Sequence, residues 1–176
     1  NGLDLKDHAY INSLLEVLEA NLSFVPSSTS KKEVADISLY DHVKLTAAFA
    51  SAIYAYLKEQ NITDYKTELY KNASLFYDKK AFLLASLDIS GIQKFIYTIT
   101  TKSALKSLRS RSFYLEIMME HIIDTLLDKL HLSRANLIYS GGGHCYMILP
   151  NTKETQIIFD EEIKNVNKWF LKRFQT

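Results

Sequence analysis

The feature that most limits the possible folds of this 176-residue chain is a continuous apolar run, AFLLASL, at residues 81–87. The run is too short to span a bilayer. A short apolar run bounded by turn residues is typical of a strand that is buried on both faces of a sheet. It ends in the tetrapeptide DISG at residues 88–91, where a helix is predicted to begin. We therefore expect a sheet in the second half of the chain, with helices packed on it.

The rest of the second half supplies the partners of this strand. A helical pattern follows it and is interrupted by β-branched residues at 98–101. Residues 135–139 and 144–149 are predicted strands, and the glycine-rich turn at 140–143 joins them as a hairpin. A final amphipathic helix carries apolar residues at Phe159, Ile163, Val166, Phe170 and Phe174. This order predicts a mixed α/β (α+β) fold, a truncated ferredoxin-like array without its last strand, so that the first strand keeps one open edge.

The first half of the chain is predicted to be helical. A helix is expected over residues 4–22 with Asp4 as its N-cap, and a second from Ser38, with Asp41 completing a capping box. Small side chains at 47–52 predict close packing of the second helix against another helix, and Asn61 ends it. We therefore divide the chain into a helical segment (1–61), a linker with room for one short helix (62–79) and an α/β domain (80–176).

Composition excludes several functional classes. Hydrophobic residues make up 47% of the chain and charged residues 23%, which is the usual globular mixture. The net charge of +1 gives no overall electrostatic attraction for nucleic acid or an anionic membrane, so any phosphate contact must come from a local patch. Cys145 is the single cysteine, which excludes an intrachain disulfide and a cysteine-based metal site. We expect a cytoplasmic protein without a membrane partner.

The ends of the predicted strands carry the chemistry. Polymerase-type palm domains bind two metal ions through carboxylates at the end of the first strand and at the hairpin, and glycines let a nucleotide approach the hairpin backbone. Those positions give the candidate nucleotide-binding residues Asp88, Ser90, Gly91, Ser140, Gly141, Gly142, Gly143 and His144. Asp88 is the one possible metal ligand, and the alternative is that it only caps the next helix. For the glycines, the alternative is a tight hairpin that binds no ligand.

Three phrases occur in order on these predicted elements: LDISGIQKFIY, LRSRSFYLE and IYSGGGH, within residues 87–144. Together they resemble the first palm domain of the large subunit of type III-A CRISPR effector complexes. Residues 36–44 resemble the end of the HD domain that precedes this palm in the family, which would make residues 1–61 a remnant of that domain. No His-Asp dipeptide occurs in the chain, so the family's nuclease site is not expected here.

The resemblance implies that this palm holds one ATP against a second, catalytic palm of the same protein. In the family, the second palm uses Mg or Mn to make cyclic oligoadenylate after target-RNA recognition, and the HD domain cleaves single-stranded DNA. Implied partners are the other subunits of the effector complex, its guide RNA and the target RNA. In this chain Gly143 and His144 stand where the second palm has aspartates, and Ser90 replaces a second metal ligand. We therefore expect a degenerate, GGDEF-like palm that binds ATP without catalysis.

Two alternatives stay open: an inactive GGDEF-type signalling domain and a ferredoxin-like RNA-binding module. RNA-binding modules stack bases on sheet aromatics, and the first strand, expected to be central, offers only Phe82. A basic cluster could contact phosphate or RNA, or simply be a solvated face; it consists of Lys102, Lys106, Arg109 and Arg111.

Overall fold

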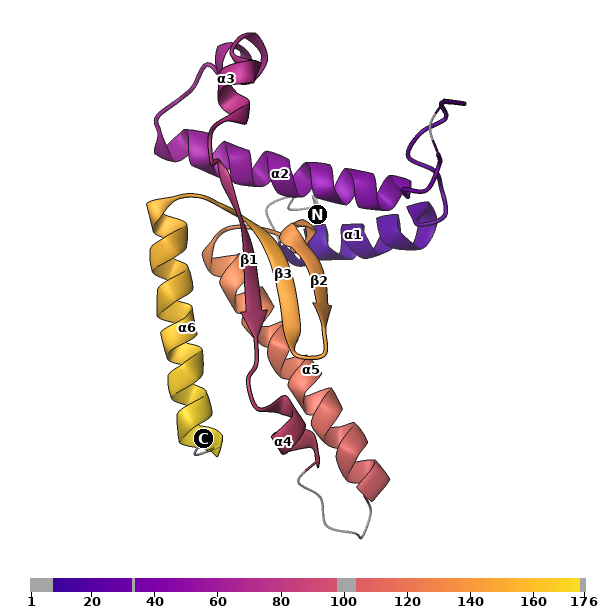
Figure 1. Ribbon diagram of the computed structural model, residues 1–176, viewed down its shortest axis with the longest axis vertical. Coiled ribbons are helices and arrows are strands. Elements are labelled where there is room, and N and C mark those ends of the chain that lie inside the picture. The colour runs from indigo at the N-terminus through magenta and orange to yellow at the C-terminus, as the bar shows by residue number, and fades with distance from the viewer. Residues whose placement is uncertain (1–7, 33, 98–103, 175–176) are drawn as a thin grey trace, which may run out of the picture.

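The computed structural model describes residues 8–32, 34–97 and 104–174, which form helices around a three-stranded antiparallel sheet (Figure 1). The elements along the chain are α1 (His8–Leu22), α2 (Leu39–Glu59), the π-helical turn η1 (Thr67–Lys71), α3 (Ala73–Tyr77), β1 (Phe82–Asp88), α4 (Ile92–Tyr97), α5 (Ala104–Lys129), the 3₁₀ turn η2 (Arg134–Asn136), β2 (Leu137–Gly141), β3 (His144–Pro150) and α6 (Lys153–Phe174). The α+β fold class predicted from the sequence is confirmed.

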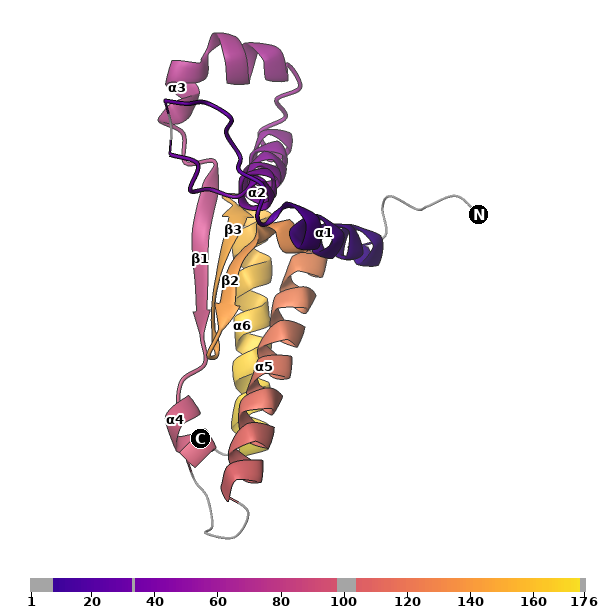
Figure 2. The ribbon, with the colours of Figure 1, turned by 90° about the vertical axis from the view of Figure 1, so that its right-hand side faces the viewer.

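The strand order of the sheet is β1-β3-β2, so β3 is the central strand. Helices α5 and α6 cover one face of the sheet, and α2 crosses the end of the sheet that is farthest from the β2–β3 turn (Figures 1 and 2). The core lies between the sheet and α5, where Met119, Ile123 and Leu126 pack against Cys145 and Met147. The other face of the sheet stays open below α2.

The prediction that residues 81–87 are buried on both faces is wrong. Exposed and half-buried side chains alternate along β1, and Leu84 keeps 69% of its surface exposed. The physical reason is that β1 pairs only with β3 among the described strands. On its exposed face, α2 covers only the start of the strand, where the Phe49 ring packs against Phe82 with 4.8 Å between centroids. Half-buried Ala85 and Leu87 pack on the core, while Leu84 and Ser86 point to the open face. In this chain, the continuous apolar run therefore forms a strand at the edge of the described sheet and not a strand buried on both faces.

The small residues of α2 pack on the sheet and not, as predicted, on a helix. Ala48 and Ala52 are fully buried against Ile148 of β3, because only small side chains let the helix lie this close to the strand. The predicted N-cap is confirmed, since the Ser38 hydroxyl accepts a hydrogen bond from the Asp41 backbone N–H at 3.0 Å. The α2 end near Asn61 is also confirmed, and the linker contains η1 and α3.

The second strand begins two residues later than predicted, at Leu137, because Arg134–Asn136 forms a 3₁₀ turn. This turn places the Asn136 side chain in the interior, where its amide nitrogen donates to the carbonyls of Ala48 (3.2 Å) and Ile148 (2.9 Å). Asn136 therefore ties α2 to the central strand. The predicted cap at Asp4 and the β-branched interruption at residues 98–101 lie outside the described residues.

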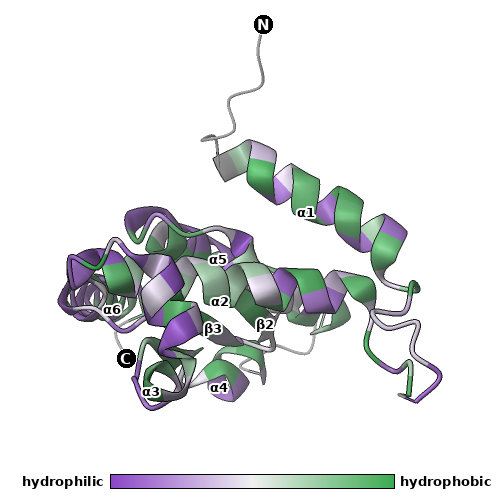
Figure 3. Ribbon diagram, turned by 90° about the horizontal axis from the view of Figure 1, so that it is seen from above, coloured by the Kyte–Doolittle hydropathy of each residue, from purple (hydrophilic) through white to green (hydrophobic). Residues whose placement is uncertain are grey.

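The predicted apolar stripe of α6 lines a cavity of about 1080 Å³ between α4, α5, α6 and the end of β1. Its residues are consequently only half-buried. None of the helices described is long and apolar enough to cross a membrane. Figure 3 shows hydrophobic and hydrophilic residues intermixed along α1, which packs beside α2.

We expect the open edge of β1, next to this cavity, to cause self-association of the chain at high concentration, because unpaired strand edges form hydrogen bonds with other strands. Analytical ultracentrifugation should show mass rising with concentration, and Leu84→Lys should suppress the rise because a charge on an edge strand disfavours pairing. Leu171→Lys, at a similarly exposed position on α6, is the matched control. A strictly monomeric wild-type chain at all concentrations would contradict this prediction.

Candidate functional site

The end of β1 and the β2–β3 turn meet at one end of the sheet, as the sequence predicted (Figure 1). Asp88 lies directly opposite His144 in the β1–β3 ladder, with 3.6 Å between Asp88 Oδ1 and His144 Nδ1. The Ile89 backbone N–H donates to the Gly143 carbonyl at 3.0 Å, which fastens the turn to the end of β1. Asp88 and His144 therefore form a pair that joins the end of β1 to the hairpin, the two places where the sequence analysis looked for metal-binding carboxylates.

The turn itself requires glycine. Gly142 and Gly143 have φ angles of +61° and +82°, which residues other than glycine rarely adopt. A Cβ on Gly143 would collide with the side chain of Ile92, the first residue of α4. A Cβ on Gly142 would meet nothing within 4 Å. The turn thus packs against α4 on one side and presents bare backbone to open space on the other.

Two aromatic residues that the sequence analysis missed stand beside this turn. Tyr139 and Tyr146 pair across β2 and β3 and are 54% and 39% exposed. The Tyr146 ring packs edge-on against the His144 ring, with 4.6 Å between centroids. A Cβ on Gly141 would lie 2.7 Å from the Tyr139 hydroxyl oxygen, so Gly141 leaves room for that side chain. The period-two alternation of β3 could have identified Tyr146 as a residue of the open face. In β2 the register shift between Leu137 and Tyr139 breaks that alternation, so the sequence pattern would have placed Tyr139 on the same face as the buried Leu137.

The remaining candidates do not share one surface. Ser140 points to the helix side, where its hydroxyl donates to Glu120 Oε1 at 3.0 Å. Ser90 and Gly91 are exposed in the short connection from β1 to α4, and the Gly91 carbonyl accepts from the Phe95 N–H. The structure thus brings Asp88, Gly142 and His144 together and turns the Ser140 side chain away from them.

The donor set does not fit a two-metal site. Asp88 faces a histidine where a second carboxylate is needed, and the described residues contain no group of three or more His, Cys, Asp or Glu side chains placed to hold a metal ion. Two-metal catalysis requires several hard oxygen ligands around ions a few ångströms apart. The residues at this site therefore do not fit a pair of catalytic metal ions.

The basic cluster is divided in the structure. Lys106 and Arg109 are exposed on α5. Arg111 instead donates to the Phe95 carbonyl at 2.5 Å and lies over the Phe95 ring, so it holds α4 against α5. Lys102 lies outside the described residues. A phosphate or RNA contact by the exposed pair stays a prediction.

The fold and the site together define a small α+β palm-like domain, with an open sheet face that ends at a glycine hairpin. Residues 81–176 match the family model described as Csm1 subunit domain B, and the chain belongs to this family. It is 55% identical over 170 residues to the type III-A CRISPR system single-strand-specific deoxyribonuclease Cas10/Csm1 of Streptococcus thermophilus, covering 97% of this chain and 22% of the relative.

Two further relatives agree with this assignment. The Mycobacterium tuberculosis Cas10/Csm1 protein is 52% identical over 171 residues, covering 97% of this chain and 21% of that protein. The crystal structure of a Csm1–Csm4 cassette in complex with one ATP matches with a TM-score of 0.75 and 36% identity, covering 93% of this chain and 21% of that one. The chain thus spans about a fifth of the length of the curated relatives it matches.

Proposed function

We propose that this chain is the non-catalytic, ATP-binding palm of a type III CRISPR large subunit. The observation that carries the proposal is the open sheet face at the hairpin. There Gly142 presents bare backbone, the exposed Tyr139 side chain reaches Gly141, and the exposed Tyr146 ring packs on His144. A solved relative is a Csm1–Csm4 cassette in complex with one ATP, which supports a nucleotide as the ligand.

The chemistry of the open face suits a nucleoside triphosphate. Aromatic rings bind bases by stacking, which contributes about 1–3 kcal/mol per base. Tyr139 and Tyr146 offer such rings, and Asp88 and His144 add a hydrogen-bonding pair at the rim. The glycine turn lets the ribose or phosphates lie directly on backbone that any side chain would cover. We place Ser90 and Gly91 beside the phosphates, at the end of β1.

The role of the longer protein is part of the same proposal. The curated relatives are named single-strand-specific deoxyribonucleases, and we propose that activity for an HD domain, of which residues 1–61 would form the end. We also propose that a second palm makes cyclic oligoadenylate with Mg or Mn. A Csm4-like subunit, a guide RNA and a target RNA would be partners in the cytoplasm; solved relatives are Csm1–Csm4 cassettes.

An RNA-binding module is the second candidate, and one observation favours it. The central strand is β3 and not β1, so the open face carries Tyr146 with Tyr139 beside it. That the first strand offers only Phe82 therefore does not argue against base stacking by the sheet. Competition separates the candidates: ATP should displace a short oligoadenylate RNA from an ATP site, whereas an RNA site would bind the RNA far more tightly than ATP.

We expect the isolated chain to bind ATP weakly, with a dissociation constant in roughly the high micromolar to millimolar range, and to make no cyclic oligoadenylate. Binding is weak because the second palm is not present to contribute contacts, and turnover is absent because the carboxylates for two metal ions are missing. Incubation with ATP and Mg or Mn, followed by chromatography, tests turnover. Appearance of metal-dependent oligoadenylate from the purified chain would refute the non-catalytic assignment.

A further inference from the structure

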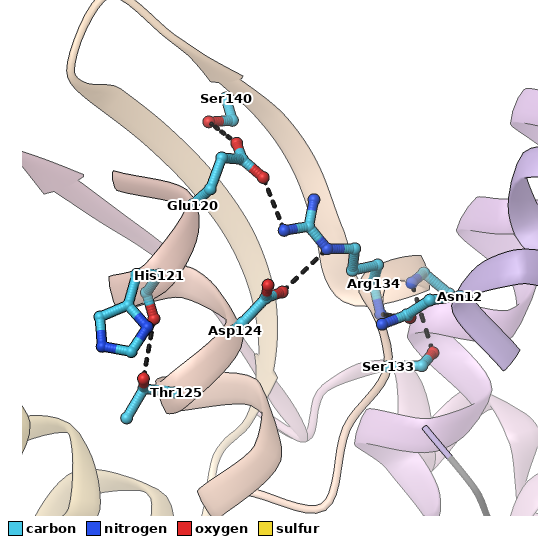
Figure 4. Close-up of polar contacts among 9 residues, drawn as sticks. Asn12, Glu120, His121, Asp124, Thr125, Ser133, Arg134 and Ser140 are labelled. Atoms are coloured by element: carbon cyan, nitrogen blue, oxygen red, sulfur yellow. Dashed lines mark hydrogen bonds and ion pairs between the residues drawn. The ribbon is translucent and has the colours of Figure 1, made fainter. Parts of the chain in front are cut away.

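A chain of polar contacts connects α1 to the hairpin strand β2 (Figure 4). The Arg134 backbone N–H donates to Asn12 Oδ1 of α1 at 3.3 Å. The Arg134 guanidinium binds two carboxylates of α5: Nη2 lies 2.6 Å from Glu120 Oε2, and Nε donates to Asp124 Oδ1 at 2.8 Å. The other oxygen of Glu120 accepts the hydrogen bond from Ser140. Arg134 is therefore linked through the Glu120 side chain to Ser140, the residue that precedes the three glycines.

The strand that receives this contact is weakly held otherwise. Strand β2 is an edge strand that pairs only with β3 in the described sheet, and its register shifts between Leu137 and Tyr139. Neighbouring residues in a strand point to opposite faces, so a slip by one residue would move every side chain to the other face. Holding Ser140 on the helix side therefore holds Tyr139 on the open face, where its hydroxyl lies beside Gly141.

The charges explain why Arg134 is needed. Glu120 and Asp124 are one helical turn apart on α5, where two like charges repel each other. Arg134 lies between them, and its pKa is raised, first by the hydrogen bond to Asp124 and then by Glu120. Without the guanidinium, the Glu120 carboxylate would lower its electrostatic repulsion with Asp124 by turning away toward water. It would then no longer accept the hydrogen bond from Ser140.

We propose that Arg134 and Glu120 are positioning residues for the nucleotide site: they fix the register of β2 through Ser140 and connect that register to α1 through Asn12. The effect on the register of β2 does not depend on the proposed function. The expected effect on ATP affinity does rest on it. Partly exposed ion pairs contribute little to global stability, and Arg134 and Glu120 keep about a third of their side-chain surface exposed (31% and 34%). Their effect should therefore appear in the hairpin more than in unfolding.

The five glycines of the chain allow a selective test, because three of them, Gly141 to Gly143, form the hairpin. In the ¹⁵N-glycine spectrum of the nucleotide-free chain, Arg134→Gln, Glu120→Gln and Ser140→Ala should all shift the hairpin signals. Lys129→Gln, which removes an α5 ion pair to Glu162 far from the hairpin, is the matched control and should leave them in place. Unmoved hairpin signals in the three variants would overturn the proposal, whether or not ATP binds.

The ATP affinity gives the second readout. Arg134→Gln should raise the dissociation constant about fivefold, Arg134→Lys should raise it less because the charge is kept, and Lys129→Gln should not change it. In a Ser140→Ala background, Arg134→Gln should have no further effect, because the connection is already broken. An undiminished effect in that background would overturn the proposed route through Ser140. If one of the substitutions Arg134→Gln, Glu120→Gln and Ser140→Ala prevents folding, the hairpin signals of the other two variants test the proposal.

Discussion

Replacing Gly142 by Trp should weaken ATP binding at least about tenfold, equivalent to 1.4 kcal/mol. A side chain on Gly142 meets no protein atom within 4 Å, so the indole would extend into the space where we place the nucleotide. The measurement is an ATP titration of the folded variant, with unfolding followed by circular dichroism. In a chimera that replaces the matching part of the Streptococcus thermophilus relative, the same substitution should abolish the cyclic oligoadenylate synthesis that we propose for a second palm.

The control for this experiment is Gly142→Asn. Gly142 has a φ angle of +61°, and asparagine tolerates that left-handed conformation better than most residues. The Asn variant therefore carries a small side chain with little backbone strain and should lose much less affinity than the Trp variant. Equal ATP affinity of the wild type and a well-folded Trp variant would show that this turn does not face the nucleotide.

The largest expected effect on stability comes from Asn136→Ala, which should lower the free energy of unfolding by about 2–3 kcal/mol. The wild-type amide is fully buried and donates to the carbonyls of Ala48 and Ile148, while its oxygen accepts from the Ser51 hydroxyl at 3.2 Å. Alanine would leave these groups without their partner and create a void between α2 and the sheet. Urea denaturation measures the loss.

Asn165→Ala is the matched control, because Asn165 is exposed on α6 and, among the described residues, its side chain donates to Glu162 alone. We expect that variant to stay within about 0.5 kcal/mol of the wild type. A loss below about 1 kcal/mol for Asn136→Ala would contradict the view that this side chain fastens α2 to the palm. In that case residues 1–61 would be a more independent unit than the contacts indicate.

Local patterns predicted most of the elements because the determinants are short-range. The Ser38–Asp41 cap, the glycine turn and the spacing of apolar residues in α6 all act over a few residues. The order of the elements then led to the correct fold class. The division into 1–61, 62–79 and 80–176 stays a prediction, although α2 packs on β3.

The errors came from properties that depend on distant partners. The apolar β1 was expected to be buried on both faces, but sequence alone does not tell how many strands and helices surround it. Ala48 and Ala52 indicated a close approach correctly, yet the partner was Ile148 and not a helix. Buried Asn136 and the inward side chain of Ser140 are likewise explained only by residues on other elements. Tyr139 likewise reaches the open face only through the register shift of β2 against β3, which the sequence pattern does not encode.

The most direct test of the central claim, that ATP binds the open sheet face at the hairpin, is an ATP titration of the ¹⁵N-glycine-labelled chain. Weak binding suits this method, since exchange is fast and shifts follow occupancy. Binding at the hairpin should cause saturable shifts of Gly141, Gly142 and Gly143, which Gly142→Trp should greatly reduce or abolish. Saturable ATP binding measured by another method, with all three hairpin signals unmoved, would place the nucleotide elsewhere and rule out the open sheet face as its site.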